Sequence, residues 1–200
     1  NGRHQDYQAA RPSYAQEFLD WLGELYAPPE RYTAADIGSG TGKLSAQLLA
    51  AGFRVCGVEP NPDMRGAAEA LLGGDPRFSS SNGTDHDTGL PDRSVDMVAA
   101  AQAFHWFDGP AFARECRRIL RPGGRAVLVW NVRGSAPMNQ ALAQVFREHC
   151  PSFHGFTGGM GEDDPRIRDF FGGAYEKRRF PNPLTLDRDR FLRRCFSSSY

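Results

Sequence analysis

The stretch Ala34-Ala35-Asp36-Ile37-Gly38-Ser39-Gly40-Thr41-Gly42-Lys43 decides the fold of this chain. Its apolar start predicts the end of a buried strand, its alternating glycines predict a tight turn, and the residues after the turn predict a helix. A glycine-rich turn between a strand and a helix lets a ligand contact backbone atoms that side chains would otherwise shield. The stretch therefore predicts a ligand site, with an ordinary glycine-rich turn as the alternative.

The spacing of the glycines separates this loop from two common nucleotide-binding loops. A phosphate-binding P-loop has a glycine five positions before its Gly-Lys pair and a serine or threonine directly after the lysine. Ile37 and Leu44 occupy those two positions, so the P-loop is excluded. The dinucleotide fingerprint Gly-x-Gly-x-x-Gly would need its third glycine at Lys43, so this fingerprint matches only in part.

The composition and charge balance limit the class of protein. Of the 200 residues, 40% are hydrophobic and 24% are charged, which is typical of a soluble globular domain. Basic and acidic residues both number 24, and zero net charge argues against a general nucleic-acid-binding protein. No apolar run is long enough to span a membrane. The four cysteines lack a paired metal-binding spacing, so we expect reduced thiols, a cytoplasmic location and no metal site.

Predicted strands and helices alternate along the first two thirds of the chain. This order predicts an α/β fold of the Rossmann-like, doubly wound type, with a mostly parallel sheet and helices on both faces. The predicted strands cover residues 32–37, 53–58, 77–80, 94–102 and 125–130, and the predicted helices cover 14–26, 43–51, 61–72 and 110–120. Beyond these we expect a helix at 138–150, a loop at 151–165, a sixth strand at 175–180 and a helix at 186–196.

Polar residues follow the first two predicted strands. Asp36 and Gly38 end the first strand, and Glu59 ends the second. In an open parallel sheet, ligands bind beyond the carboxyl ends of the strands, and a carboxylate there accepts hydrogen bonds from ribose hydroxyls. The same carboxylate would serve NAD, so Glu59 alone does not identify the cofactor.

Several motifs in sequence order resemble one enzyme family. An acidic residue two positions before Gly-x-Gly-x-Gly resembles motif I of the class I S-adenosylmethionine-dependent methyltransferases. Three later segments resemble others of that family: Thr-Gly-Leu-Pro-Asp-Arg-Ser-Val-Asp at 88–96, Ala-Gln-Ala-Phe-His-Trp-Phe at 101–107 and Arg-Ile-Leu-Arg-Pro-Gly-Gly at 118–124. The run Tyr-x-x-x-Arg-Pro-Ser-Tyr at 7–14 is similar to the N-terminal segment of its small-molecule subgroup, methyltransferase type 11, which includes trans-aconitate-methyltransferase-like enzymes.

The resemblance covers roughly residues 5–131 and implies S-adenosylmethionine as cofactor. Gly38 and Gly40 would approach its methionine moiety, and Asp36 would orient the loop and receive the ammonium; a buried acid at the helix start is the alternative for Asp36. Glu59 would hold the ribose hydroxyls. The cofactor-contacting residues implied in this way are Tyr7, Arg11, Asp36, Gly38, Gly40, Glu59, Pro60, Asn61, Met64, Thr84, Asp85 and Gln102.

For some of these residues, a structural role is an alternative to cofactor binding. Tyr7 and Arg11 would reach the cofactor from a lid segment, since arginine suits a carboxylate, although the residues after Arg11 also suit a plain helix start. Asn61 and Met64 would flank the adenine, with core packing as the alternative for Met64. At the adenine edge, Gly-Thr-Asp-His at 83–86 departs from the usual Gly-Thr-Ala-Glu, so Asp85 would either accept the adenine amino hydrogen or be a solvated turn residue.

The segment after the fourth strand would face the methyl acceptor. Gln102 would face the methionine portion of the cofactor, and Phe104, Trp106 and Trp130 would bind the acceptor. His105 is the candidate general base, because neutral imidazole takes a proton near pH 7; a structural hydrogen bond is its alternative. Proximity and alignment alone also suffice for many methyl transfers. The residues 131–171 would shape the acceptor pocket, with Phe153, His154 and Phe156 as further lining residues.

We therefore expect methyl transfer from S-adenosylmethionine to a small-molecule acceptor, at oxygen, or alternatively at nitrogen or carbon. Residues 1–31 would form an N-terminal helical lid segment, 32–131 the cofactor-binding core, and 132–200 a substrate-side insertion and the C-terminal part of the same domain, truncated relative to a seven-stranded family sheet. The rivals are an NAD-dependent oxidoreductase, which lacks support from a Tyr-x-x-x-Lys pair, a nucleic-acid or protein methyltransferase, and a non-catalytic cofactor-binding module. No membrane or nucleic-acid partner is expected, and the oligomeric state stays open.

Overall fold

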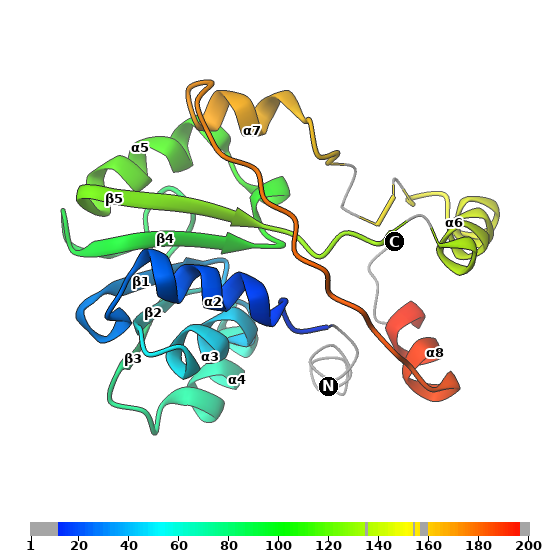
Figure 1. The fold of residues 1–200 in the computed structure, drawn as a ribbon, viewed down its shortest axis with the longest axis horizontal. Coiled ribbons are helices and arrows are strands. Elements are labelled where there is room, and N and C mark those ends of the chain that lie inside the picture. The colour runs from blue at the N-terminus through cyan, green and yellow to red at the C-terminus, as the bar shows by residue number, and fades with distance from the viewer. Residues whose placement is uncertain (1–11, 135, 154, 157–159, 197–200) are drawn as a thin grey trace.

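A five-stranded sheet forms the centre of the molecule (Figure 1). The computed structural model describes residues 12–134, 136–153, 155–156 and 160–196. All strand pairs are parallel, and the strand order is β3-β2-β1-β4-β5. The order reverses between β1 and β4, which confirms the predicted doubly wound fold. The strands are β1 (Thr33–Ile37), β2 (Arg54–Val58), β3 (Phe78–Ser81), β4 (Val95–Ala101) and β5 (Leu120–Val129).

Helices cover both faces of the sheet (Figure 1). They are α2 (Gln16–Leu25), α3 (Lys43–Ala50), α4 (Pro62–Leu72), α5 (Gly109–Ile119), α6 (Pro137–His149), α7 (Pro165–Phe170) and α8 (Arg188–Phe196), with short 3-10 turns η1 (Pro29–Arg31) and η2 (Phe104–Trp106). Helices α2 and α3 pack on one face, and α5 and α7 on the other. Figure 1 shows α6 and α8 beyond the carboxyl ends of the strands. No helix in the described part of the chain is long and apolar enough to cross a membrane.

The two faces of the sheet bury alternate residues of the same strands. Ala34 of β1 belongs to the apolar cluster under α2 and α3, and Ala35 belongs to the cluster under α5 and α7. Successive strand side chains point to opposite faces, so a strand covered on both sides needs an unbroken apolar run. Phe53 and Phe112 are the large buried residues that fill the two clusters.

Helices α4 and α5 begin at side chains that cap their first turn. The Oδ1 atom of Asn61 accepts hydrogen bonds from the backbone N–H groups of Asp63 (3.0 Å) and Met64 (3.2 Å) at the start of α4. At the start of α5, the Oδ1 atom of Asp108 accepts from the N–H of Ala111 at 3.0 Å. A proline follows near each cap, where its missing N–H has no helical partner to lose. These caps fix where both helices start.

One expectation about the later part of the chain was wrong. The predicted sixth strand at 175–180 does not form, because residues 173–187, all of them described, run as an irregular extended segment. We call this segment the strap. The predicted loop at 151–165 is confirmed in its described residues up to the start of α7 at Pro165, a short helix that was not predicted and that Asp164 caps. The strap crosses the molecule past the end of β5 and leads to α8 (Figure 1).

The strap is attached to α2 by aromatic contacts. The ring of Phe180 lies 5.9 Å from that of Phe18 and 6.0 Å from that of Trp21, measured between centroids. The guanidinium of Arg178 lies over the ring of Trp21 at 5.1 Å. Aromatic pairs at such distances stabilise by about 0.5–1.5 kcal/mol each, so the strap docks on α2 through aromatic contacts.

A buried carboxylate connects the loop after β3 to α5. Glu115 is 6% exposed, and its Oε1 atom accepts from the backbone N–H of Thr88 (2.9 Å) and from the Thr88 hydroxyl (2.6 Å). Arg118 donates to both carboxylate oxygens, at 2.8 Å and 2.7 Å. These hydrogen bonds, with Arg118 first, lower the pKa of Glu115 to about 2.

Replacing Glu115 with glutamine should destabilise the protein by about 2 kcal/mol at pH 7, because Arg118 loses its charged partner. The folded pKa lies below the ordinary value of 4.5, so the stability from Glu115 is present above pH 4.5 and is lost as the pH falls towards 2. Urea unfolding of wild type and variant at pH 7 and at pH 3 measures both effects. The exposed Glu69→Gln change on α4 is the control; equal losses in both variants would contradict the argument.

Candidate active site

The glycine loop between β1 and α3 has the conformation that its sequence predicts. Gly38, Gly40 and Gly42 have φ values of 69°, 57° and 82°, in the left-handed region that favours glycine. A Cβ on Gly38 would lie 2.8 Å from the Cβ of Ala103, so a larger residue at position 38 would also clash with Ala103. A Cβ on Gly40 would meet no described atom within 4 Å. As far as the described residues go, Gly40 therefore borders open space, where a ligand can approach the backbone.

Glu59 joins the end of β2 to this loop. It is 7% exposed; its Oε2 atom accepts from the N–H of Gly40, and its Oε1 atom accepts from the N–H of Asn61, both at 2.9 Å. A carboxylate offers about four acceptor positions. The two backbone bonds leave acceptor capacity for hydroxyl groups of a ligand beside Gly40.

Asp36, the last but one residue of β1, is a buried acid with one unsatisfied oxygen. It is 1% exposed, and its Oδ2 atom accepts from the hydroxyl of Ser45 on α3 at 2.7 Å. Its Oδ1 atom is buried and has no hydrogen-bond partner among the described residues. Burial raises the pKa of Asp36 to about 6, against the opposing hydrogen bonds from Ser45. A buried carboxylate in this state is stabilised by a cation or a donor.

At the predicted adenine edge, Asp85 and Thr84 make hydrogen bonds within the protein. The Oδ2 atom of Asp85 accepts from the backbone N–H of Asp108 at 3.1 Å, and its Oδ1 atom lies 3.1 Å from Nδ1 of His86. Asp85 thus ties the loop after β3 to the first residue before α5. The Thr84 hydroxyl accepts from the N–H of Asp87 at 3.1 Å. Thr84 thus stabilises its own loop, Asp85 links that loop to the start of α5, and the contact of either side chain with a cofactor stays a prediction.

Gln102 follows β4 with a strained backbone. Its φ of 55° is left-handed although it has a side chain, a conformation that costs on the order of 1 kcal/mol or more. Its N–H donates to the carbonyl of Val129 at 2.8 Å. Its Nε2 atom donates to the carbonyl of Asn131 at 3.2 Å. The end of β5 therefore holds Gln102 by both its backbone and its side chain.

The aromatic residues after β4 point in different directions. Phe104 is 2% exposed and contacts the rings of Phe112 and Phe170 in the core. This placement contradicts the prediction that Phe104 faces an open acceptor space; the 3-10 turn η2 directs it into the apolar cluster. Trp106, in contrast, is 77% exposed. His105 lies between them, its ring 5.0 Å from that of Trp106.

Trp130 lies after β5 with its ring 6.3 Å from that of Phe104, edge to face. Its Nε1 atom is buried, and the described residues offer it no hydrogen-bond acceptor. Tryptophan N–H groups usually have a partner when buried. Trp130 therefore presents a donor that no described residue uses, near the carboxyl end of the sheet.

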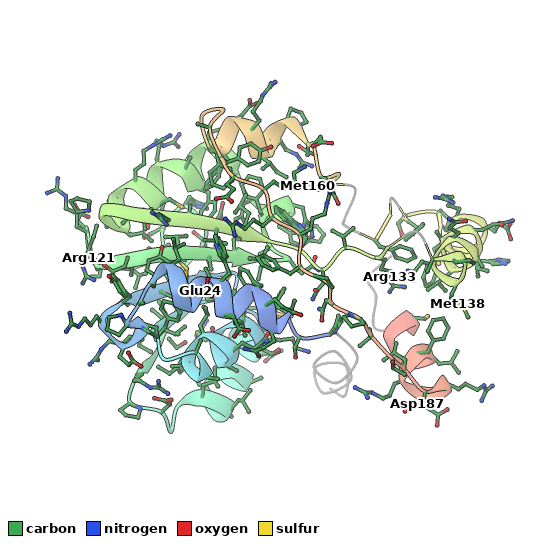
Figure 2. All side chains as sticks on the ribbon, viewed as in Figure 1. Glu24, Arg121, Arg133, Met138, Met160 and Asp187 are labelled. Atoms are coloured by element: carbon green, nitrogen blue, oxygen red, sulfur yellow. The ribbon has the colours of Figure 1, made fainter. Side chains whose placement is uncertain are left out.

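The predicted acceptor-pocket residues of the later segment gather around α6. Phe153 and Phe156 contact Phe146 of α6 and each other, with ring centroids 5.1–6.0 Å apart. Phe156 also lines a pocket of about 480 Å³ together with Arg147 and other residues, and the guanidinium of Arg133 lies 4.0 Å over its ring. Figure 2 shows Arg133 beside α6, far from Arg121 at the start of β5. His154, Tyr7 and Arg11 lie outside the described residues.

Comparison with known proteins identifies the family. Residues 35–128 match a model described as a methyltransferase domain. An uncharacterized methyltransferase of Mycobacterium bovis, Mb3374, is 42% identical over 127 residues, which are 64% of this chain and 49% of that protein. A putative type II methyltransferase from Anaeromyxobacter dehalogenans has a solved structure that is 33% identical, with a TM-score of 0.57 over 88% of this chain and 70% of that one. The chain belongs to the class I S-adenosylmethionine-dependent methyltransferase family.

A relative from a yeast is also similar to this chain. The uncharacterized methyltransferase C25B8.09 of Schizosaccharomyces pombe is 31% identical over 147 residues, 72% of this chain and 57% of that protein. The chain spans about half the length of the curated relatives it matches. Membership implies S-adenosylmethionine as the cofactor, while the closer likeness to trans-aconitate methyltransferases stays a prediction.

The described residues fit this cofactor. The unsatisfied Oδ1 atom of Asp36 suits an ammonium group, Gly40 borders open space, and Glu59 keeps acceptor capacity for ribose hydroxyls. Met64 is partly exposed beside the Asn61 cap, and Pro60 lies between Glu59 and Asn61. Within the described ranges, no group of three His, Cys, Asp or Glu side chains could hold a metal ion.

Sequence reasoning missed two features of the site. Ser45 holds Asp36 from the first turn of α3, and this place in the helix after the loop is a signal that helical spacing could have revealed. Asn131 holds Gln102 from the end of β5. No pattern in the sequence points to Asn131, since its partners lie far away along the chain.

Proposed function

We propose that this family member transfers the methyl group of S-adenosylmethionine to a small-molecule acceptor, at an oxygen atom. The observation that carries the choice of cofactor is the buried carboxylate oxygen of Asp36, for which the described residues provide no donor. The methionine end of S-adenosylmethionine brings an ammonium group, whereas NAD has none. When bound, S-adenosylmethionine supplies an activated methyl group on its sulfonium. Zero net charge supports a small acceptor over a nucleic acid.

Three residues are assigned to the acceptor side in this proposal. Trp106 offers an exposed aromatic surface, and the Trp130 indole has a donor that no described residue uses. His105 is the group that takes the proton lost by an acceptor hydroxyl. An acceptor hydroxyl needs such a base more than a neutral amine does, because the pKa of the hydroxyl is far above neutral pH and a neutral amine already has a free electron pair. We therefore propose oxygen, rather than nitrogen or carbon, as the methylated atom.

Isothermal titration calorimetry with S-adenosylhomocysteine, and with NAD in a parallel cell, tests the cofactor assignment. We expect S-adenosylhomocysteine to bind with a Kd on the order of 10 μM, about −7 kcal/mol, and NAD not to bind. Binding of NAD alone would overturn the proposal. Turnover assays with phenol, carboxylate and amine acceptors then test the reaction: product from hydroxyl or carboxyl acceptors supports oxygen, product from amines alone overturns it, and cofactor binding without any turnover supports a non-catalytic module.

A further inference from the structure

Three segments that are far apart in sequence meet beyond the end of β5. The Nδ2 atom of Asn182, in the strap, donates to the carbonyl of Ser13 at 2.8 Å and to the Oδ1 atom of Asn131 at 2.9 Å. The Nδ2 atom of Asn131 donates to the same Ser13 carbonyl at 3.3 Å. We call Ser13, Asn131 and Asn182 the asparagine clamp. Figure 1 shows the strap passing this end of β5 on its way from α7 to α8.

The clamp reaches the candidate cofactor site through Gln102. The carbonyl of Asn131 accepts from Nε2 of Gln102 at 3.2 Å, while Asn182 and Ser13 hold the Asn131 side chain. Gln102 keeps a left-handed backbone, and strained residues of this kind persist only where their surroundings hold them. Whatever fixes Asn131 therefore also fixes Gln102 at the carboxyl end of β4.

The clamp also reaches the helix that follows the glycine loop. Next to Ser13, the N–H of Tyr14 donates to Oε1 of Gln47 at 2.9 Å, and the carbonyl of Tyr14 accepts from Nε2 of Gln47 at 3.0 Å. Gln47 lies on α3, which begins at the last residue of the glycine-loop stretch. The backbone at 13–14 is thus held on one side by the clamp and on the other by α3. The clamp therefore connects the end of β4, through Gln102, with the middle of α3, through Gln47.

We propose that Asn131 and Asn182 are positioning residues for the cofactor site: the strap, through Asn182, holds the end of β5 and so sets the place of Gln102 at the sulfonium end of S-adenosylmethionine. The inference rests on the proposed function, because its ligand is that cofactor. The amide of Asn182 suits this task because both of its N–H donors are used, one on each partner. Its loss removes two of the three hydrogen bonds of the clamp and leaves only the 3.3 Å bond from Asn131 to the Ser13 carbonyl.

The strap has a second attachment that makes the proposal testable. Phe180, two residues before Asn182, packs on Phe18 and Trp21 of α2. Removing the Asn182 side chain therefore leaves the strap docked and changes only the clamp. A change in cofactor affinity would then report positioning, and a change in thermal midpoint alone would report stability.

The experiment measures the Kd of S-adenosylhomocysteine by calorimetry, and the thermal midpoint, for wild type, Asn182→Ala, Asn131→Ala and the double variant. We expect each single change to raise the Kd about fivefold to tenfold, the size of one lost hydrogen bond. The double variant should lose less than the product of the two, because the residues act through each other. Asn139→Ala on α6, which also removes a side-chain bond to a backbone carbonyl, is the matched control and should change the Kd less than twofold.

The outcomes separate this inference from the proposed function. Wild type that fails to bind S-adenosylhomocysteine overturns the proposed function and this inference with it. Wild type that binds, with Asn182→Ala binding equally well, overturns the inference alone, whether or not the thermal midpoint falls. An equal loss in Asn139→Ala also overturns it, since the effect would then not be specific to the clamp.

Discussion

Replacing Asp36 with asparagine should stabilise the unliganded protein and weaken its binding of S-adenosylhomocysteine about 100-fold. At pH 7 the buried carboxylate is charged, and its rise in pKa from 3.8 to about 6 corresponds to about 3 kcal/mol of destabilisation. Asparagine keeps an oxygen for the Ser45 hydroxyl but brings an amide donor that the described residues leave unpaired, which costs about 1–3 kcal/mol. We expect a net gain of about 1 kcal/mol in the free energy of unfolding.

The affinity falls because the proposed partner of Asp36 is the ammonium of the cofactor. A buried hydrogen-bonded charge pair that loses one member costs about 2–5 kcal/mol. The loss of affinity therefore exceeds the gain in stability. A residue that destabilises the free protein and stabilises the complex is typical of a binding site.

The pH dependence of Asp36 has a definite sign. The unfolded carboxyl loses its proton near 3.8, whereas the folded one keeps it until about pH 6. Between these two pH values the folded state thus binds more protons than the unfolded state. The contribution of Asp36 to stability therefore falls as the pH rises from about 4 to about 6, and it does not change further above pH 6. Affinity for the ligand should change in the opposite sense, because the carboxylate that pairs with the ammonium forms as the pH rises through 6.

Urea unfolding and calorimetry at pH 4.5, 5.5, 6.5 and 7.5 measure both quantities in wild type and Asp36→Asn. The variant should lack the slope between pH 4 and 6. Asp20→Asn on the exposed side of α2 is the control and should change neither quantity. A variant that is less stable and binds equally well would show that Asp36 serves the fold alone.

The core of the fold could be predicted from the sequence because its signals are local. The strand before the glycine loop is an apolar run ended by glycine, and β1 ends at Ile37 as predicted. Helix α4 begins where Asn61 and Pro62 indicate, since the cap and the proline act on neighbouring backbone. For β5 the sequence predicted only the second part of the strand. The predicted start at Arg125 is where regular pairing with β4 begins, but the strand already starts at Leu120, which pairs with Val95 across a register shift.

The parts that could not be predicted depend on contacts between distant residues. The run at 175–180 has strand-like residues, yet it docks on α2 through Phe180 and pairs with no strand. In η2 the sequence could not show which aromatic side chain faces inward, because a single short turn has no hydrophobic period to read; Phe104 is buried and Trp106 is exposed. Asp85 binds a backbone group 23 positions away, and no local pattern encodes that partner.

Replacing Glu59 with alanine should reduce the affinity for S-adenosylhomocysteine about 100-fold while leaving the fold intact. The carboxylate holds the N–H groups of Gly40 and Asn61, each at 2.9 Å, and in our proposal it also accepts the ribose hydroxyls. Its removal therefore loosens the loop beside the open space at Gly40 and removes the ligand's acceptor as well. Hydrogen bonds to a charged group are worth about 1.5–3 kcal/mol each. Calorimetry measures the affinity, and circular dichroism measures the folded fraction.

A graded series separates the two roles of Glu59. Glu59→Gln keeps one acceptor oxygen for a backbone N–H, so its affinity should lie between those of wild type and Glu59→Ala. Glu69→Ala, an exposed acid on α4, is the control and should bind like wild type. If Glu59→Ala bound S-adenosylhomocysteine as tightly as wild type, the ribose would not be held at β2, and the ligand would lie elsewhere along the carboxyl edge of the sheet. If both Glu59 variants lost affinity equally, the charge of the carboxylate would hold the loop and the ribose, and the number of acceptor atoms would not matter.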